Sequence, residues 1–180
     1  MKSMAVVLEQ PEQLVLSQLE LTPPGEDDVV VDIAWSGIST GTEKLLWSGR
    51  MPSFPGMGYP LVPGYESVGR VSHAGANSGR RTGESVFVPG SSCFGPVRGL
   101  FGGATRRLVV PGARALPIDG QMGERDLEER MHAFLAGDAD VAAVIGQAFR
   151  QDGFCTPRIG CTEASRGGLS WLVPAFPSTT

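Results

Sequence analysis

The clearest alternation of apolar and polar positions lies at residues 29–35. Four apolar side chains recur there at every second position, which places them on one face of an extended strand, whereas Asp32 falls on the other face. They are Val29, Val31, Ile33 and Trp35. Shorter runs predict further strands at 5–8, 14–16, 85–88 and 104–111. Because strands and turns follow one another without intervening helices, the pattern favours a mostly antiparallel barrel.

Prolines and glycines mark out the stretch from residue 60 to residue 71. Two prolines without backbone donors exclude residues 60–63 from the centre of a sheet. Gly64 then predicts a turn or a close backbone approach, and Gly69, inside an apolar run, predicts a bulge or a tight neighbour. Glu66 lies between the proline loop and the apolar strand, where a carboxylate is expected to be either paired or functional.

The periodicity changes after Gly120. Apolar residues spaced i, i+4, i+7 and i+8 predict amphipathic helices at 126–136 and 141–149, and residues 153–180 show no period. We therefore expect two parts. The first is a β-barrel domain at 1–120, and the second is an atypical tail at 121–180 with two short helices followed by irregular chain.

Composition narrows the class of protein. The 25 glycines and 14 prolines among 180 residues favour short strands joined by turns. A net charge of −4 gives no electrostatic case for a nucleic-acid partner, and no apolar run is long enough to span a membrane as a helix. Three scattered cysteines do not form a disulfide framework. A reduced, cytoplasmic protein is expected, and a homo-oligomer is left open.

Several fixed positions between residues 64 and 86 form a recognisable signature. They read Gly64-Tyr65-Glu66, Gly69, Val71 and Gly75, followed by Gly83-Glu84-Ser85-Val86. This pattern resembles the medium-chain dehydrogenase/reductase superfamily. The resemblance implies that residues 1–120 form a GroES-like, partly open β-barrel of the alcohol-dehydrogenase type.

The chain departs from that superfamily at the metal positions. Ser39 and Tyr65 stand where many members have the cysteine and the histidine that bind catalytic zinc. Neutral hydroxyls are poor zinc ligands, and the four closely spaced cysteines of the structural-zinc lobe are reduced to Cys93. No metal site is therefore expected, and Cys93 is expected to be a small buried apolar side chain.

Four segments narrow the resemblance to one branch of the superfamily. They lie at 36–43, 47–52, 63–66 and 88–95. Together they resemble the bacteriochlorophyllide dehydrogenases of phototrophic bacteria, over about residues 1–124. The branch implies oxidation of a 3-(1-hydroxyethyl) group on a chlorin to 3-acetyl, with NAD as the hydride acceptor. From Arg125 the resemblance stops, and we expect a shifted reading frame or a divergent end.

A dinucleotide domain requires Gly-x-Gly-x-x-Gly between a strand and a helix. The sequence contains no such run, because Gly167-Gly168 lacks both a third glycine and a preceding strand pattern. No Rossmann domain and no cofactor-binding residues are therefore predicted. NAD is expected for the intact family but not for this chain alone, which is expected to be inactive by itself.

The resemblance also implies the residues that carry the chemistry. Thr42 matches the hydroxyl that relays the substrate's proton in the superfamily. Without zinc, proton removal rests on hydrogen-bonding side chains, and Ser39, Tyr65 and Glu66 are the others that the sequence offers. For Glu66 the alternative is a structural ion pair.

Flat and polarizable side chains gather in the loop at 44–59. The predicted substrate-binding residues are Trp47, Met51, Phe54 and Tyr59, which suit a planar chlorin. The alternative is that the loop packs its own aromatics against the barrel. Two other functions also remain open: a stand-alone barrel that binds a macrocycle or a partner protein without chemistry, and a zinc-free quinone-type reductase.

Overall fold

The computed structural model describes residues 1–38, 40–99, 101–118 and 171–174. The helices predicted at 126–136 and 141–149 lie outside these residues. The described elements are β1 (Lys2–Gln10), β2 (Gln13–Glu20), β3 (Asp28–Ile38), α1 (Thr40–Trp47), β4 (Glu66–Ala74), β5 (Ser85–Val88), β6 (Arg107–Pro111), the 3₁₀ turn η1 (Gly112–Arg114), β7 (Leu116–Pro117) and β8 (Trp171–Pro174). The mainly β fold class is confirmed.

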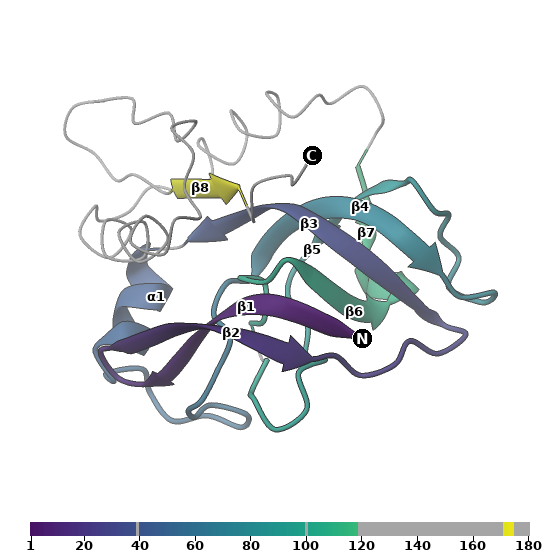
Figure 1. Cartoon of the computed structure of the whole chain (residues 1–180). Helices are drawn as coiled ribbons and strands as arrows, with labels where there is room; N and C mark the ends of the chain where they lie inside the picture. The colour runs from purple at the N-terminus through teal and green to yellow at the C-terminus, as the bar shows by residue number, and fades with distance from the viewer. Residues whose placement is uncertain (39, 100, 119–170, 175–180) are drawn as a thin grey trace, which may run out of the picture.

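Strand β3 is the centre of the larger sheet, whose order is β6-β3-β4-β5-β7 (Figure 1). Strand β4 pairs antiparallel with one edge of β3. On the other edge, β6 lies opposite the start of β3 and β8 lies opposite its end. The strand predicted at 29–35 is thus hydrogen-bonded on both sides.

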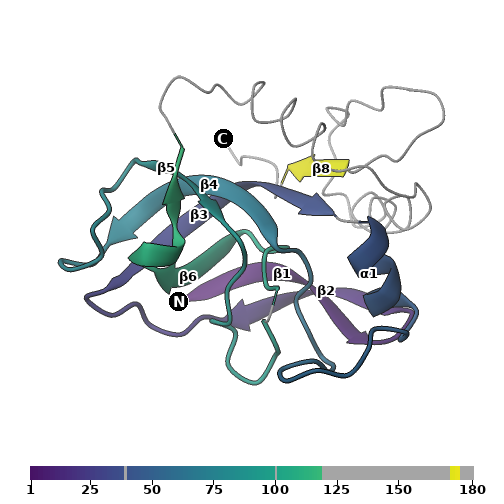
Figure 2. The same cartoon turned by 180° about the vertical axis from the view of Figure 1, so that it is seen from behind.

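Strands β1 and β2 form a separate antiparallel hairpin that lies along one side of the larger sheet (Figures 1 and 2). Single backbone hydrogen bonds join the hairpin to the segment before β6: Val6 N–H donates to Ala104 O at 2.9 Å, and Arg106 N–H donates to Met4 O at 2.9 Å. Because two sheets meet through such bonds rather than through a continuous ladder, the barrel is partly open. The expected fold, a partly open β-barrel, is therefore confirmed for the described residues.

The main hydrophobic core fills the space between the hairpin and the larger sheet. Val29 and Val31 of β3 are fully buried and pack with Val71 of β4 and Leu108 of β6. The predicted single apolar face is only partly right, because Val30 is also just 4% exposed. Both faces of β3 are covered near its start, whereas Ala34 further along the strand is exposed, and alternation alone does not reveal this difference.

Gly69 occupies the tight position that the sequence predicted. The pairing of β3 with β4 shifts between Ile33 and Trp35, so that one extra residue of β3 bulges out beside Gly69. A Cβ atom at Gly69 would lie only 2.1 Å from the carbonyl oxygen of Asp32. The bulge also breaks the alternation, which leaves the Trp35 side chain half-buried.

Helix α1 follows β3 directly and adds one short helix to the succession of strands. Its last carbonyl, that of Trp47, accepts a 2.8 Å hydrogen bond from Glu12 N–H in the turn between β1 and β2. Figure 2 shows α1 at the end of the barrel beside this turn. This hydrogen bond holds the end of α1 against the hairpin.

Strand β8 differs from the irregular chain expected at 153–180. Its four residues pair antiparallel with the end of β3, from Trp35 to Ile38. Trp, Leu and Val favour extended structure, but a run of this length is too short to show an alternation.

No helix among the described residues is long and apolar enough to cross a membrane.

Candidate functional site

The structure brings together two of the four predicted catalytic side chains. Thr42 lies in the first turn of α1, and Tyr65 immediately precedes β4. The two hydroxyl oxygens, Thr42 Oγ1 and Tyr65 Oη, are 3.3 Å apart, and either one can be the donor. Both side chains are half-buried. A hydroxyl pair of this kind can pass a proton from one oxygen to the other while staying accessible from one side.

The backbone turn before Tyr65 is held between α1 and the segment that leads into β6. Gly64 has φ +84°, and a Cβ atom there would lie 3.0 Å from the backbone nitrogen of Ala104. The Gly64 carbonyl accepts a 2.6 Å hydrogen bond from Gly103 N–H, and Pro63 O accepts one of 2.8 Å from Ala104 N–H. The close backbone approach predicted for Gly64 is confirmed.

Glu43 is a structural residue of the site that the sequence analysis did not single out. Its side chain is 2% exposed, and its Oε1 accepts a 3.2 Å hydrogen bond from Gly64 N–H. Glu43 follows Thr42 directly, so one turn of α1 presents both the hydroxyl and the carboxylate that hold the 64–65 turn. The only signal in the sequence was the position of Glu43 beside Thr42.

Phe101 was also missed. Its ring centroid lies 5.6 Å from that of Tyr65, and the two planes are tilted by 50°. Tilted aromatic pairs at this separation are attractive, so the contact restrains the Tyr65 ring. Phe101 stands in a glycine-rich loop, and no local pattern indicates which distant ring it meets.

Glu66 is buried next to this pair without joining it. The residue is 7% exposed, and its Oε2 atom has no hydrogen-bond partner among the described residues. None of the ion pairs within the described part of the chain includes Glu66, so the structural ion pair that the sequence left open is not seen there. Burial raises the pKa of the Glu66 carboxyl above its ordinary value. Ser39, the remaining predicted catalytic residue, lies outside the described residues.

Three of the four predicted substrate-binding side chains pack against the barrel. Trp47, Met51 and Tyr59 pack on a small cluster formed by Leu8, Leu46 and Leu61. The Tyr59 hydroxyl donates a hydrogen bond to the carbonyl of Leu46, and burial raises the pKa of this phenol. The structure thus shows the packing that the alternative described, while each side chain remains half-buried rather than fully covered.

Phe54 is half-buried and is not part of that cluster. The role of all four residues as substrate contacts stays a prediction. Phe101 packs on the same cluster, so the loop at 44–59 and the Tyr65 ring share one continuous apolar support.

The residues at this site do not fit a catalytic zinc ion. Thr42 and Tyr65 present neutral hydroxyls that already bond each other, and such groups are poor zinc ligands. Among the described residues, no three His, Cys, Asp or Glu side chains lie close enough together to hold a metal ion. No step of the chemistry is therefore assigned to a metal.

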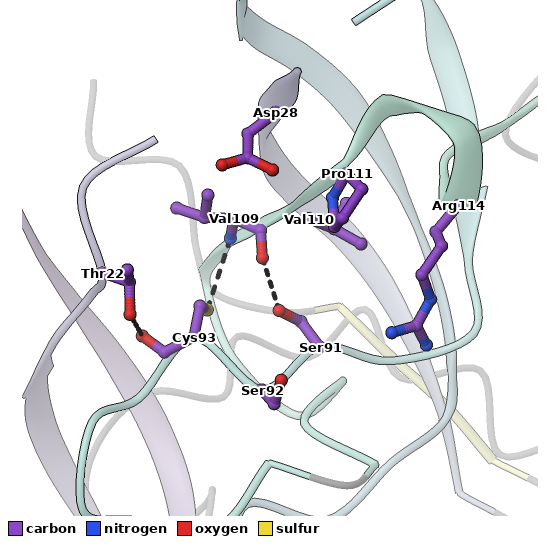
Figure 3. A pocket seen from close by; sticks show the side chains of 9 residues that line it. All are labelled: Thr22, Asp28, Ser91, Ser92, Cys93, Val109, Val110, Pro111 and Arg114. Carbon is purple, nitrogen blue, oxygen red and sulfur yellow. Dashed lines mark hydrogen bonds between the residues drawn. The ribbon is translucent and has the colours of Figure 1, made fainter. Parts of the chain in front are cut away.

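A pocket of about 150 Å³ opens elsewhere on the barrel, beside β6 and η1 (Figure 3). Its lining includes Thr22, Cys93 and Arg114 and none of the site residues. The Thr22 hydroxyl donates to Cys93 O at 3.4 Å, and Cys93 Sγ accepts a 3.3 Å hydrogen bond from Val109 N–H. Cys93 is 5% exposed, and burial raises the pKa of its thiol, so the predicted role as a small buried side chain is confirmed.

Comparison with known proteins identifies the family of this barrel. The chain is 56% identical over 124 residues to 2-desacetyl-2-hydroxyethyl bacteriochlorophyllide A dehydrogenase of Cereibacter sphaeroides, a match that covers 66% of this chain and 39% of that protein. The protein of the same name from Rhodobacter capsulatus is 54% identical over 124 residues, which covers 68% of this chain and 40% of the relative. This chain thus spans about two fifths of the length of the curated relatives that it matches.

The fold comparison points the same way. A solved alcohol dehydrogenase from Escherichia coli CFT073, complexed with NADH, superposes with a TM-score of 0.53 at 26% identity and covers 69% of this chain and 40% of that one. The family model of the alcohol dehydrogenase GroES-like domain matches residues 25–120. The resemblance that the sequence signature implied is confirmed, and the chain belongs to the alcohol dehydrogenase GroES-like domain family.

Proposed function

We propose that this barrel is the substrate-facing domain of a dehydrogenase that oxidises the 3-(1-hydroxyethyl) group of a bacteriochlorophyllide to 3-acetyl. The observation that carries the proposal is the identity of 56% and 54% to two dehydrogenases named for a hydroxyethyl bacteriochlorophyllide.

The oxidation removes a hydride from the carbon that bears the hydroxyl and a proton from its oxygen. A nicotinamide supplies the hydride acceptor when it is bound. No strand followed by Gly-x-Gly-x-x-Gly and a helix occurs among the described residues. We therefore place the nicotinamide site of the proposed enzyme outside them. NADH in the similar Escherichia coli structure supports the cofactor class.

The proton is the part of the reaction that this chain's own residues handle. The hydroxyls of Thr42 and Tyr65 lie 3.3 Å apart, so one can accept the substrate proton while it passes its own proton to the other, which in turn releases its proton to solvent at its partly exposed side. The Phe101 ring and the fixed Gly64 turn hold Tyr65 in place for this step. The Oε2 atom of Glu66 has no hydrogen-bond partner among the described residues, and we propose for Glu66 only the role of a nearby proton-holding carboxyl.

The direct test is binding of the substrate by the purified chain. The chain is titrated with 3-hydroxyethyl bacteriochlorophyllide, and the absorption and fluorescence of the chlorin are followed. A saturable change with one site per chain is expected, and the 3-acetyl product should compete. Absence of saturable binding contradicts the proposal. Saturable binding without oxidation, once a complete nucleotide domain is joined to the barrel, instead favours a non-catalytic chlorin-binding module.

A further inference from the structure

Arg98 is an exposed cation whose backbone is fixed beside the loop at 44–59. The backbone N–H of Arg98 donates to Pro60 O at 2.9 Å, and the backbone carbonyl of Arg98 accepts a 2.8 Å hydrogen bond from Val62 N–H. The two bonds flank an isolated parallel bridge between Leu61 and Arg98. The Cα atom of Arg98 is therefore anchored to the segment that leads into the Gly64 turn.

The guanidinium of Arg98 is anchored as well. Its Nη1 donates to Tyr59 O at 3.0 Å. Gly58 has φ +151°, and a Cβ atom at this position would lie 3.0 Å from both Cζ and Nε of Arg98. The absence of a side chain at Gly58 lets the flat guanidinium lie against the backbone.

Most of the hydrogen-bonding capacity of this guanidinium is unused. The group carries five N–H donors in a rigid fork, and the structure gives one side-chain hydrogen bond for it. None of the ion pairs within the described part of the chain includes Arg98. With a net charge of −4 the chain offers an anion no general attraction, so binding of an anion here would depend on the Arg98 guanidinium itself.

One apolar cluster connects Arg98 with the hydroxyl pair. Tyr59, whose carbonyl holds the guanidinium, packs on the same leucine cluster as Phe101, and the Phe101 ring contacts Tyr65. This series of contacts runs from a cation, through half-buried aromatic side chains, to the hydroxyls of Tyr65 and Thr42. A chlorophyllide presents a matching set of groups: a free propionate carboxylate, a flat apolar ring and a hydroxyethyl group.

We propose that Arg98 binds the propionate carboxylate of the chlorophyllide and thereby selects the free acid over its ester. The inference rests on the proposed function, because it takes the substrate from there. A planar guanidinium pairs with a carboxylate through two parallel N–H···O bonds, and an ester offers no charge for this pairing. Arg98 is a specificity-determining residue and takes no part in the proton transfer.

The test compares two ligands on the complete 180-residue chain. 3-Hydroxyethyl bacteriochlorophyllide and its methyl ester are titrated into the wild-type chain, Arg98→Gln and Arg98→Lys, with chlorin fluorescence as the readout. For the wild type we expect the acid to bind about 5- to 10-fold more tightly than the ester, as for a charge-assisted bond at a partly exposed site. Arg98→Gln should weaken binding of the acid to the affinity of the ester and leave the affinity of the ester unchanged. The affinity of Arg98→Lys for the acid should lie between those of the wild type and Arg98→Gln.

Arg70→Gln is the matched control. Arg70 is also exposed and also donates from Nη1 to one backbone carbonyl, that of Gly83, at 3.3 Å, but it lies on β4 away from the aromatic cluster. This variant should keep the acid-to-ester ratio of the wild type. A further readout is salt, because added salt should weaken binding of the acid alone.

The possible failures are distinguishable. If the wild-type chain binds acid and ester equally, the role of Arg98 is overturned while the proposed function stands. If it binds neither, both proposals are overturned. If Arg98→Gln weakens acid and ester by the same factor, the residue supports the loop and does not select the carboxylate. Circular dichroism of each variant separates such effects from unfolding.

Discussion

The hydroxyl oxygens of Thr42 and Tyr65 lie 3.3 Å apart although 23 positions separate the two residues in the chain. The contact exists because Gly64 turns the backbone at φ +84° and because Glu43 accepts the Gly64 N–H. The geometry of the site therefore depends on the turn as much as on the two hydroxyls.

Substitution of Gly64 by alanine should destabilise the barrel. The backbone angle φ of +84° at this position is unfavourable for a residue that has a Cβ atom. The new Cβ atom would also lie 3.0 Å from the backbone nitrogen of Ala104. We expect Gly64→Ala to lower the free energy of unfolding by about 2–3 kcal/mol. Urea denaturation followed by circular dichroism measures the change.

Gly79→Ala is the control for the backbone conformation alone. Gly79 has φ +67°, and a Cβ atom there would meet nothing within 4 Å. We expect this variant to lose only about 1 kcal/mol. Equal losses in the two variants would show that the close approach of Ala104 to Gly64 contributes nothing.

Removal of either hydroxyl should slow the oxidation. With the barrel joined to the remaining chain of the Cereibacter sphaeroides relative, Thr42→Ala or Tyr65→Phe should reduce turnover by roughly 10²-fold, the usual effect of losing acid–base assistance. Ser48→Ala is the control, because the Ser48 hydroxyl makes local hydrogen bonds at the end of α1: it donates to Lys44 O at 2.7 Å and accepts from Arg50 Nε at 3.1 Å. Wild-type rates in both site variants would remove the hydroxyl pair from the mechanism.

The buried carboxyl of Glu66 predicts a pH-dependent stability. Burial raises its folded-state pKa above the unfolded value, so the folded chain binds the proton more tightly than the unfolded chain does. The resulting stabilisation is fully present below the unfolded pKa and is lost as pH rises through the folded pKa. Glu66→Gln should therefore gain stability relative to the wild type as pH rises from about 4 to about 7.

Urea midpoints for the wild type and Glu66→Gln across this range provide the measurement. Glu9→Gln, at an exposed position of β1, is the control and should show no comparable trend. A difference between Glu66→Gln and the wild type that stays constant with pH would show that the carboxyl titrates alike in the folded and unfolded chains.

Measurement of the zinc content of the purified chain tests the prediction that its residues do not bind catalytic zinc. Because Ser39 and Tyr65 stand at the positions of zinc ligands in the superfamily, the purified chain should contain far less than one zinc per molecule. Dialysis against a chelator should leave the unfolding midpoint unchanged. About one tightly held zinc ion per chain would refute this expectation.

The sequence predicted the parts of the fold that local patterns encode. Alternation identified β3. The lack of a Cβ atom in glycine identified the Gly64 turn and the tight neighbour of Gly69, because this one residue type decides both features. It did not predict that Val30 is buried together with Val29 and Val31, since burial on both faces depends on what packs over the strand.

The site was predictable only through side chains that a signature places. Thr42 and Tyr65 were named from the superfamily resemblance, whereas the hydrogen bond between them was not predicted. The Phe101 ring and the Glu43 carboxylate reach the 64–65 turn through contacts that no spacing encodes. The aromatic loop illustrates the same limit, because composition indicates flat side chains but not that Trp47 and Tyr59 pack on Leu8, Leu46 and Leu61.

Turnover by a chimera tests the central proposal most directly. Residues 1–118 of this chain replace the matching segment of the Cereibacter sphaeroides relative, and conversion of the 3-hydroxyethyl group to 3-acetyl is followed by the absorption shift of the chlorin with NAD present. The account predicts turnover within about 10-fold of the parent enzyme, since no residue used for acid–base catalysis is lost. A folded chimera that binds the chlorin but does not oxidise it, beside an active parent, would contradict the account.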